Sequence, residues 1–150
     1  MLCLIVLSGC GTSSNDQLPE ETDWEPTVHE TVNNLDGVAM VVKSYTVSPT
    51  GLTVTFENNT DKQCIYGEDF LLEKKKDGEW FQVPVKLESY GFNDIGFDLD
   101  PSSVSEWTVD WEWLYGSLTS GEYRIVKDIL EFRNPGDYDK YYLAGEFTVN

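Results

Sequence analysis

Short runs of alternating or β-branched residues dominate the chain from residue 36 onward. Segment 52–57 places Leu, Val and Phe on one side and Thr and Glu on the other, and segment 104–113 alternates in the same way. A period of two residues is typical of a strand with one buried face. Further strand-like runs occupy 38–47, 70–75, 79–83, 122–127 and 142–149. The pattern therefore predicts about seven strands and no long helix.

Turn residues indicate how these strands connect. Asp77-Gly78 stands between the runs 70–75 and 79–83, and an Asp-Gly pair in that position is typical of a β-hairpin because both residues tolerate positive φ. The longest irregular stretch, 89–101, contains two glycines and a proline. Short strands separated by such turns favour an antiparallel β-sandwich. We therefore expect an all-β fold.

The first ten residues have a different character. Residues 1–9 read MLCLIVLSG, apolar and without charge, and precede Cys10. A helix of that length spans about 14 Å, too short for a hydrocarbon core of roughly 30 Å. The stretch is typical of the apolar region and cleavage site of a signal peptide. The basic residues that normally come first are missing, so we expect residues 1–9 to be the remnant of a longer signal peptide.

Residues 7–10, Leu-Ser-Gly-Cys, resemble the lipobox of bacterial lipoproteins, in which small residues precede an obligatory cysteine. The resemblance implies that the Cys10 thiol receives a diacylglycerol and that cleavage makes Cys10 the new N-terminus. Acyl chains on Cys10 would then hold the protein stably on a membrane. This predicts an extracytoplasmic protein that is lipid-anchored to the cell membrane.

Residues 10–35 are predicted to be a lipidated cysteine followed by a flexible acidic tether. From residue 11 to about residue 34 the chain has no Lys or Arg, two prolines and few aliphatic residues. Such a composition does not favour a packed core. Trp24 and Val28 are the residues that can dock locally if the first strand starts earlier than residue 36. The remaining residues, 36–150, are predicted to form the folded domain.

Charge and cysteine usage limit the possible partners. The formal net charge of −17 repels nucleic-acid phosphates and anionic lipid headgroups, so we expect no nucleic-acid partner. Of the three cysteines only Cys64 falls inside the predicted domain, so neither a disulfide framework nor zinc-ligand spacing is present. Cys64 is interpreted as a small buried hydrophobe or a free thiol. No cofactor is predicted.

The sequence offers little for catalysis. The one histidine, His29, lies in the predicted tether, whereas a Ser-His-Asp or Cys-His arrangement needs an imidazole fixed inside a packed site. No glycine-rich phosphate loop precedes a helix. An enzyme is therefore the weakest of the functional hypotheses.

Two groups of residues are candidates for ligand binding. Asp94, Asp98 and Asp100 cluster in the glycine-rich loop and suggest calcium, which prefers carboxylate and carbonyl oxygens, although their spacing matches no EF-hand. Trp113 and Tyr115 lie near a strand end and are candidates for an exposed binding surface. The earlier tryptophans of that run, at 107 and 111, are expected to fill the core between the sheets.

Segment 118–124 resembles the tyrosine corner of immunoglobulin-like sandwiches. Leu118, Gly121 and Tyr123 occupy the matching positions, and in that motif the tyrosine hydroxyl bonds back to the preceding loop. Antibody domains carry a cysteine two residues later, where this chain has Ile125. The resemblance implies a sandwich that is closed without an inter-sheet disulfide.

Residues 36–150 also resemble a bacterial immunoglobulin-like domain that is common in predicted lipoproteins of Gram-positive bacteria. The segments that carry this resemblance are 66–73, 76–80, 111–116 and 121–127. That family implies the fold and a cell-surface location but no general catalytic activity. We expect a binding or adhesion module that contacts a protein or an envelope polymer through loops or sheet edges. The alternative is an accessory or sensor lipoprotein that contacts a membrane protein.

Overall fold

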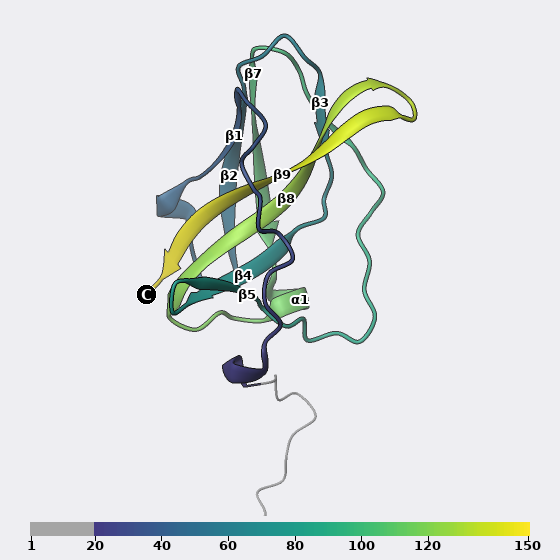
Figure 1. Ribbon diagram of the computed structural model, residues 1–150. Coiled ribbons are helices and arrows are strands. Elements are labelled where there is room, and N and C mark those ends of the chain that lie inside the picture. Colours follow the sequence, from purple (N-terminus) through teal and green to yellow (C-terminus); the bar gives the residue numbers. More distant parts are fainter. Residues whose placement is uncertain (1–19) are drawn as a thin grey trace, which may run out of the picture.

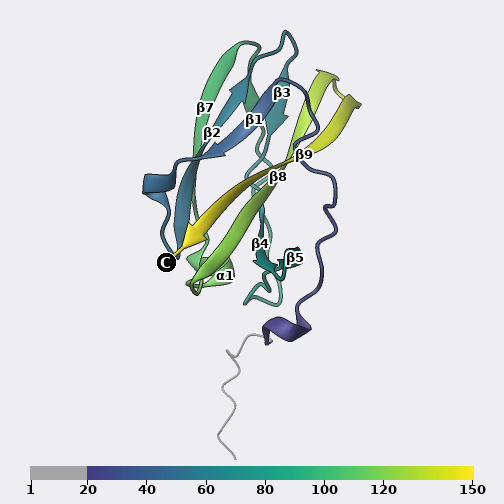
Figure 2. The ribbon, with the colours of Figure 1, turned by 60° about the vertical axis from the view of Figure 1, so that its left-hand side comes forward.

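Two antiparallel sheets face each other in the computed structural model, which describes residues 20–150 (Figures 1 and 2). The smaller sheet has the strand order β1-β2-β7, and the larger has the order β5-β4-β8-β3-β6, with β9 also paired to β8. Within the described range the strands are β1 Val38–Val42, β2 Gly51–Asn58, β3 Cys64–Tyr66, β4 Leu71–Lys76, β5 Glu79–Gln82, β6 Phe97–Leu99, β7 Ser103–Asp110, β8 Gly121–Asn134 and β9 Asp137–Val149. The predicted all-β sandwich is confirmed, and β3 and β6 are the strands that the pattern did not predict.

The smaller sheet follows its sequence pattern closely. Leu52, Val54 and Phe56 on β2 are at most 2% exposed and face the larger sheet. Thr53 points the other way, and its hydroxyl lies 2.8 Å from the hydroxyl of Thr108 on β7. The period of two residues therefore separates a buried face from a solvated one, as predicted.

The Asp-Gly hairpin is also confirmed. Asp77 and Gly78 connect β4 to β5 with φ angles of 53° and 79°, the positive values that a tight turn of this kind needs. Two of the basic residues before this turn are not free surface charges. Lys74 is only 8% exposed and pairs with Glu21, while the Lys76 ammonium lies 4.9 Å from the centroid of the Phe81 ring.

The predicted strand 104–113 ends early. The Asp110 carboxylate accepts a hydrogen bond from the Glu112 N–H at 2.9 Å, and a single helical turn, α1 (Glu112–Tyr115), begins there. A side-chain acceptor two residues before the donor competes with the sheet ladder for the backbone. The turn sends the aromatic side chains at 111, 113 and 115 in different directions, so they no longer share one face.

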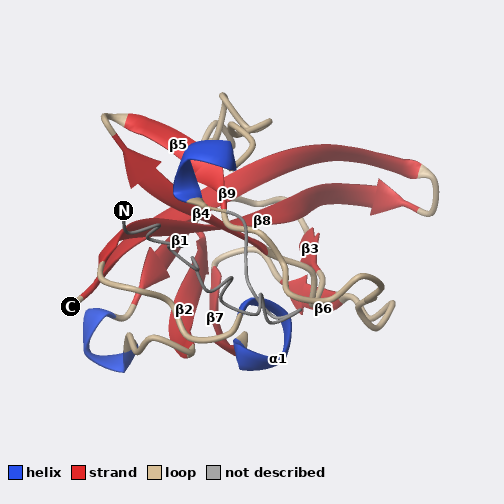
Figure 3. Ribbon diagram, turned by 90° about the horizontal axis from the view of Figure 1, so that it is seen from below, coloured by secondary structure: helices blue, strands red, loops and turns tan. Residues whose placement is uncertain are grey.

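The β8–β9 hairpin is longer than the two runs predicted for it. Its first half belongs to the core, where Ile125, Ile129 and Leu143 have no exposed surface. Its second half projects from the sandwich as an arm (Figure 3), and residues 133–140 around the connecting turn are exposed. Because the arm lacks a buried face, it lacks the apolar alternation by which a strand is recognised in a sequence.

One lateral edge of the sandwich closes where β1 lies against β9. A Cβ atom at Gly145 of β9 would lie 2.8 Å from Cγ2 of Val42, so the absence of a side chain allows this close approach. The side chains between the sheets include Trp111, Tyr123 and Phe56, each at most 1% exposed. Among residues 20–150 no disulfide crosses this core, and the Cys64 thiol is free and buried.

Residues 23–34, here called the N-terminal strap, lie along the larger sheet (dark purple in Figure 2). The Thr27 N–H donates to Trp80 O at 2.9 Å, and the Gln82 N–H donates to Glu25 O at 2.8 Å, so the strap extends the sheet beyond β5. Farther along, the Asn33 amide bonds both backbone groups of Ala144 on β9, at 3.2 and 2.9 Å.

The strap differs from the flexible tether expected for residues 10–35. Its polar composition is compatible with order because its backbone groups find partners on the exposed edges of β5 and β9. The local docking considered for Trp24 occurs, whereas Val28 is 71% exposed. The signal-peptide residues 1–9, the lipidation candidate Cys10 and the first part of the tether lie outside the described residues.

Candidate functional site

The connection between β5 and β6, residues 83–96, is the longest segment without a strand or helix inside the domain. Its exposed apolar side chains are Leu87, Tyr90 and Ile95, which are 38–48% exposed. Long irregular loops in compact domains are more often functional than structural. The sequence marked this region only through its glycines and aspartates, not through its apolar residues.

An aromatic row crosses from this loop to α1. The Tyr90 and Phe92 rings meet edge to face at 5.9 Å between centroids, and Phe92 meets Trp113 in the same way at 6.0 Å. The Trp113 indole N–H donates to Asp110 O at 3.0 Å, which fixes the orientation of the ring, yet the residue is 43% exposed. The exposure expected for Trp113 is therefore observed.

Tyr115 was expected to share that exposed surface, and this is wrong. It is 4% exposed, and its hydroxyl accepts a hydrogen bond from the Leu72 N–H at 3.3 Å. The helical turn of α1 directs the ring inward, which a straight strand would not have done. Burial raises the Tyr115 pKa to about 12, so the hydroxyl stays protonated at neutral pH.

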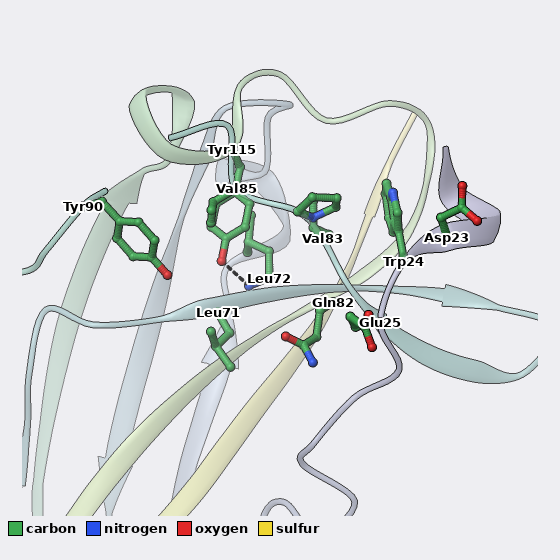
Figure 4. A pocket seen from close by; sticks show the side chains of 11 residues that line it. Asp23, Trp24, Glu25, Leu71, Leu72, Gln82, Val83, Val85, Tyr90 and Tyr115 are labelled. Atoms are coloured by element: carbon green, nitrogen blue, oxygen red, sulfur yellow. Dashed lines mark hydrogen bonds between the residues drawn. The ribbon is translucent and has the colours of Figure 1, made fainter. Parts of the chain in front are cut away.

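Tyr115 instead contributes to a pocket of about 350 Å³, the strap pocket, which is open to solvent between the beginning of the strap, β4 and the long loop. Figure 4 places Tyr90 and Tyr115 toward one end of the pocket and Trp24 and Asp23 toward the other. Apolar side chains form its interior, and polar groups stand at its rim. The lining comprises Asp23, Trp24, Glu25, Leu71, Leu72, Gln82, Val83, Pro84, Val85, Tyr90 and Tyr115.

The tryptophans at 107 and 111 belong to the interior, as expected. Trp111 has no exposed surface, and its indole N–H donates to Pro49 O at 2.8 Å. Its ring lies 5.7 Å from Phe147, which in turn stacks on Tyr123. Trp107 is partly buried and packs against the same core.

A lysine lies between the sheets next to Trp107. The Lys127 ammonium is 3.8 Å from the centroid of the Trp107 ring and donates to Gly67 O and Asp69 O at 2.7 and 2.8 Å. Burial lowers the Lys127 pKa to about 8, and nearby carboxylates, Asp69 foremost, oppose that shift. The sequence did carry a signal for this residue, since Lys127 follows Tyr123 and Ile125 at a spacing of two on the buried face.

A second buried charge lies on the outer side of the larger sheet, under the strap. The Arg124 guanidinium donates to Glu73 Oε1 at 2.8 Å and to His29 O at 3.0 Å, and it lies 4.7 Å from the centroid of the Trp80 ring. Glu73 has no exposed surface, and its Oε2 has no hydrogen-bond partner within the described residues. His29 therefore takes part through its backbone, and its ring lies 4.3 Å from that of Tyr142.

The calcium candidates do not converge. Asp94 belongs to the long loop, Asp98 lies on β6, and the Asp100 carboxylate accepts a hydrogen bond from the Gln63 amide at 3.0 Å. Within residues 20–150, no three His, Cys, Asp or Glu side chains gather as a metal ion would require. The geometry thus gives the calcium hypothesis no support.

The residues assigned to the tyrosine corner lie at the start of β8. The Tyr123 hydroxyl donates to Thr119 O at 2.8 Å, a bond back to the preceding loop of the kind that the motif implies. Leu118 is buried, and its N–H donates to Pro49 O at 2.9 Å. At Gly121 a Cβ atom would lie 2.7 Å from Cε of Lys74, so the absence of a side chain leaves room for the Lys74 side chain.

In the part of the chain that the structure describes, no helix combines the length and apolar character needed to cross a membrane. No curated protein matches the sequence. Among solved structures, the ASH / PapD-like domain of human CEP192 (PapD-like domain 7) is similar to this chain with a TM-score of 0.39 and 11% sequence identity. The match covers 83% of this chain and 96% of that one.

A family described as Bacterial Ig-like domain matches residues 34–148, which is most of the chain. The matched range includes both sheets and the long loop, while the strap residues before 34 precede it. Ig-like domains are generally non-catalytic. On this match, and with the sandwich described above, the chain belongs to the bacterial Ig-like domain family.

Proposed function

We propose that this protein is a membrane-anchored surface lipoprotein whose Ig-like domain is a non-catalytic binding module. The support for the anchor is the lipobox-like sequence that ends at Cys10. Acyl chains on Cys10 would hold the molecule at the extracytoplasmic face of the cell membrane. The folded domain would then present its loops to a protein or an envelope polymer.

The aromatic row of Tyr90, Phe92 and Trp113 is the observation that carries the binding role. Tyrosine and tryptophan are enriched where proteins bind partners, because they offer large contact areas with few rotatable bonds. Here the Trp113 ring is held by a hydrogen bond to Asp110 O and by its contact with Phe92. Little side-chain freedom remains to be lost on association, so the exposed ring area contributes more fully to affinity.

The position of the strap pocket favours the accessory role as a second candidate. Asp23, Trp24 and Glu25 line the pocket, and about a dozen residues separate them from Cys10. Even a fully extended chain of that length spans at most roughly 45 Å. A pocket held so near a lipid anchor is well placed to contact the extracytoplasmic part of a membrane protein.

The anchor is tested by growing cells with an alkyne-labelled palmitate and comparing the native chain with Cys10→Ser. Labelling of the native chain at the membrane, lost in Cys10→Ser, is the expected result. Cys64→Ser is the matched control and should keep the label, because that thiol is buried in the core. Equal labelling of Cys10→Ser, or a native protein free in the medium, would remove the anchor from the proposal.

The binding surface is tested with a photoreactive amino acid at position 113 in intact cells. The control carries the same group at Val104, which is 64% exposed on the outer face of the smaller sheet. We expect discrete adducts from position 113 and few from position 104. Adducts with cell-wall or external partners support adhesion, whereas adducts with membrane proteins support the accessory role. Equal adducts from both positions, or none from either, would contradict a binding surface at the aromatic row.

A further inference from the structure

We propose that the strap pocket binds a cationic side chain, lysine or arginine, presented by a basic peptide segment of the partner protein. The inference rests on the proposed binding function and deepens it, since it names the chemistry of the partner. The residues that carry it are the rim carboxylates of Asp23 and Glu25 and the aromatic rings of Trp24, Tyr90 and Tyr115.

The residues that line the pocket carry negative charge only. Asp23 and Glu25 are both exposed at the rim, and the lining contains no lysine, arginine or histidine. Neither carboxylate forms an ion pair within the described residues. With a net charge of −17 on the whole chain, the field around the rim attracts cations and repels anionic ligands.

The aromatic walls suit the same ligand. A cation near the face of a tryptophan or tyrosine ring is attracted by the ring quadrupole. The Lys76 ammonium already lies 5.5 Å from the centroid of the Trp24 ring, so the charged end of the ligand is placed nearer to Tyr90 and the rim carboxylates. The Tyr115 hydroxyl stays neutral at physiological pH, so it adds no charge to the interior.

The interior suits the rest of a long basic side chain. Leu71, Val83 and Val85 line the pocket, whose volume of about 350 Å³ is near the lower end of the range for small-ligand sites. Lysine and arginine bury apolar stems while their charged ends stay near water. An aliphatic stem packed against these residues would place the charged end of the ligand near the rim carboxylates. A purely apolar ligand would leave these carboxylates without a counter-charge.

The acidic rim of the pocket lies outside the range of the family match. Asp23, Trp24 and Glu25 precede the range that the family match covers, which begins at residue 34. The sandwich supplies the interior of the pocket, and the beginning of the strap supplies its acidic rim. The ligand preference proposed here therefore depends on a segment outside the matched domain.

The test titrates the purified full chain carrying Cys10→Ser with acetyl-trilysine amide, in about 0.15 M salt so that long-range attraction is screened. The readout is the set of indole N–H signals in proton–nitrogen NMR spectra, with the Trp24 signal assigned by Trp24→Phe. We expect a saturable shift of the Trp24 signal and little change at Trp113. The same peptide with all three lysines acetylated should bind at least about tenfold more weakly, because it keeps the stems but loses the charges.

Two double variants separate the pocket from general electrostatics. Asp23→Asn with Glu25→Gln should weaken trilysine binding about tenfold. Asp137→Asn with Asp139→Asn removes the same charge from the exposed arm and should leave binding nearly unchanged. Equal losses in both double variants, equal binding of the acetylated peptide, or no saturable shift at Trp24 would each overturn the inference. The crosslinks expected from position 113 in cells do not depend on the strap pocket. Failure of this inference can therefore be distinguished from failure of the binding function.

Discussion

The outer faces of the two sheets are built in opposite ways. On the smaller sheet, Thr53, Thr108 and Glu106 face solvent, and Lys43 pairs with Glu106 at the surface. On the larger sheet, the strap covers part of the outer face, and the Glu73–Arg124 pair lies almost fully buried beneath it. Breaking an ion pair is therefore expected to cost much more stability on the larger sheet than on the smaller one.

The contrast also explains which strands could be predicted from the alternation of apolar and polar residues. A sheet with one solvated face produces apolar and polar residues in alternation, which is why 52–57 and the part of 104–113 up to residue 110 were identified correctly. The part of the larger sheet that the strap covers does not, since its outer residues are buried as well. Glu73 and Arg124 look like ordinary surface charges in the sequence, yet they are among the least exposed charged residues of the described chain.

The largest expected effect is that of Arg124→Ala. Removing the guanidinium leaves the Glu73 carboxylate buried without a counter-charge, which costs about 3–5 kcal/mol of unfolding free energy. Lys43→Ala, the matched change on the smaller sheet, should cost at most about 1 kcal/mol, because its partner Glu106 is solvated. Urea unfolding followed by tryptophan fluorescence measures both values.

A paired replacement provides the control for Arg124→Ala. Glu73→Met with Arg124→Met removes both charges and should recover much of the lost stability, as apolar replacements of buried ion pairs often do. If Arg124→Ala costs no more than Lys43→Ala, the two outer faces are energetically alike and the contrast between them fails.

The second prediction concerns the charge between the sheets. The pKa of Lys127 is lowered to about 8 from its model-compound value of 10.5, so the folded state disfavours the ammonium form. This destabilisation is complete below the folded pKa and is relieved as the pH rises toward the unfolded pKa. The stability of the native chain relative to Lys127→Met should therefore increase by about 1 kcal/mol per pH unit above pH 8.

Urea unfolding of both chains between about pH 7 and 9.5 measures this difference. Subtracting the variant removes contributions from tyrosines, whose titration the two chains share. A difference that stays constant over this range, or that falls as the pH rises, would mean that Lys127 is not desolvated between the sheets.

Asn33→Ala tests the strap at its far end. The change removes the paired hydrogen bonds to Ala144 and places alanine at a φ of 58°, which asparagine tolerates better. We expect a loss of about 1–2 kcal/mol and faster amide exchange near Ala144. Asn34→Ala, the exposed neighbouring position, is the control. An unchanged amide exchange rate near Ala144 in Asn33→Ala would show that the strap does not depend on these two hydrogen bonds.

The smallest effect is expected on the solvated face. Thr108→Ala removes a cross-strand hydroxyl contact with Thr53 and should cost roughly 0.2–1 kcal/mol. A double-mutant cycle with Thr53→Ala isolates that contact from the change in strand propensity. A coupling energy above about 2 kcal/mol would mean that this face is less solvated than its exposure indicates.

The fold could be predicted from the sequence wherever a strand has one buried face or a recognisable turn. The Asp77-Gly78 hairpin and the residues assigned to the tyrosine corner belong to this group, because both follow local rules. The short strands β3 and β6 were missed because each has only three residues, too few to show a period. The arm of the β8–β9 hairpin was missed because it buries neither face.

The candidate site was predicted only in part. Trp113 was selected for its place near a strand end, and it is exposed. Tyr115 was misplaced because one side-chain hydrogen bond at Asp110 converts a strand end into a helical turn. The strap pocket depends on long-range pairing between Glu25 and Thr27 of the strap and β5, and such pairing leaves no periodic signal in the sequence.

The strap also determines how a force applied to the anchored end of the chain would be transmitted to the domain. In the anchored state proposed here, load from Cys10 reaches the strap before it reaches β1. The hydrogen bonds at Thr27 and Asn33 follow one another along the strap, so they would yield in turn rather than together. About ten freed residues would add up to roughly 35 Å of reach while the sandwich stays folded. The same release would carry Asp23 and Glu25 away from Tyr115, so tension on the anchor and occupancy of the strap pocket would oppose each other.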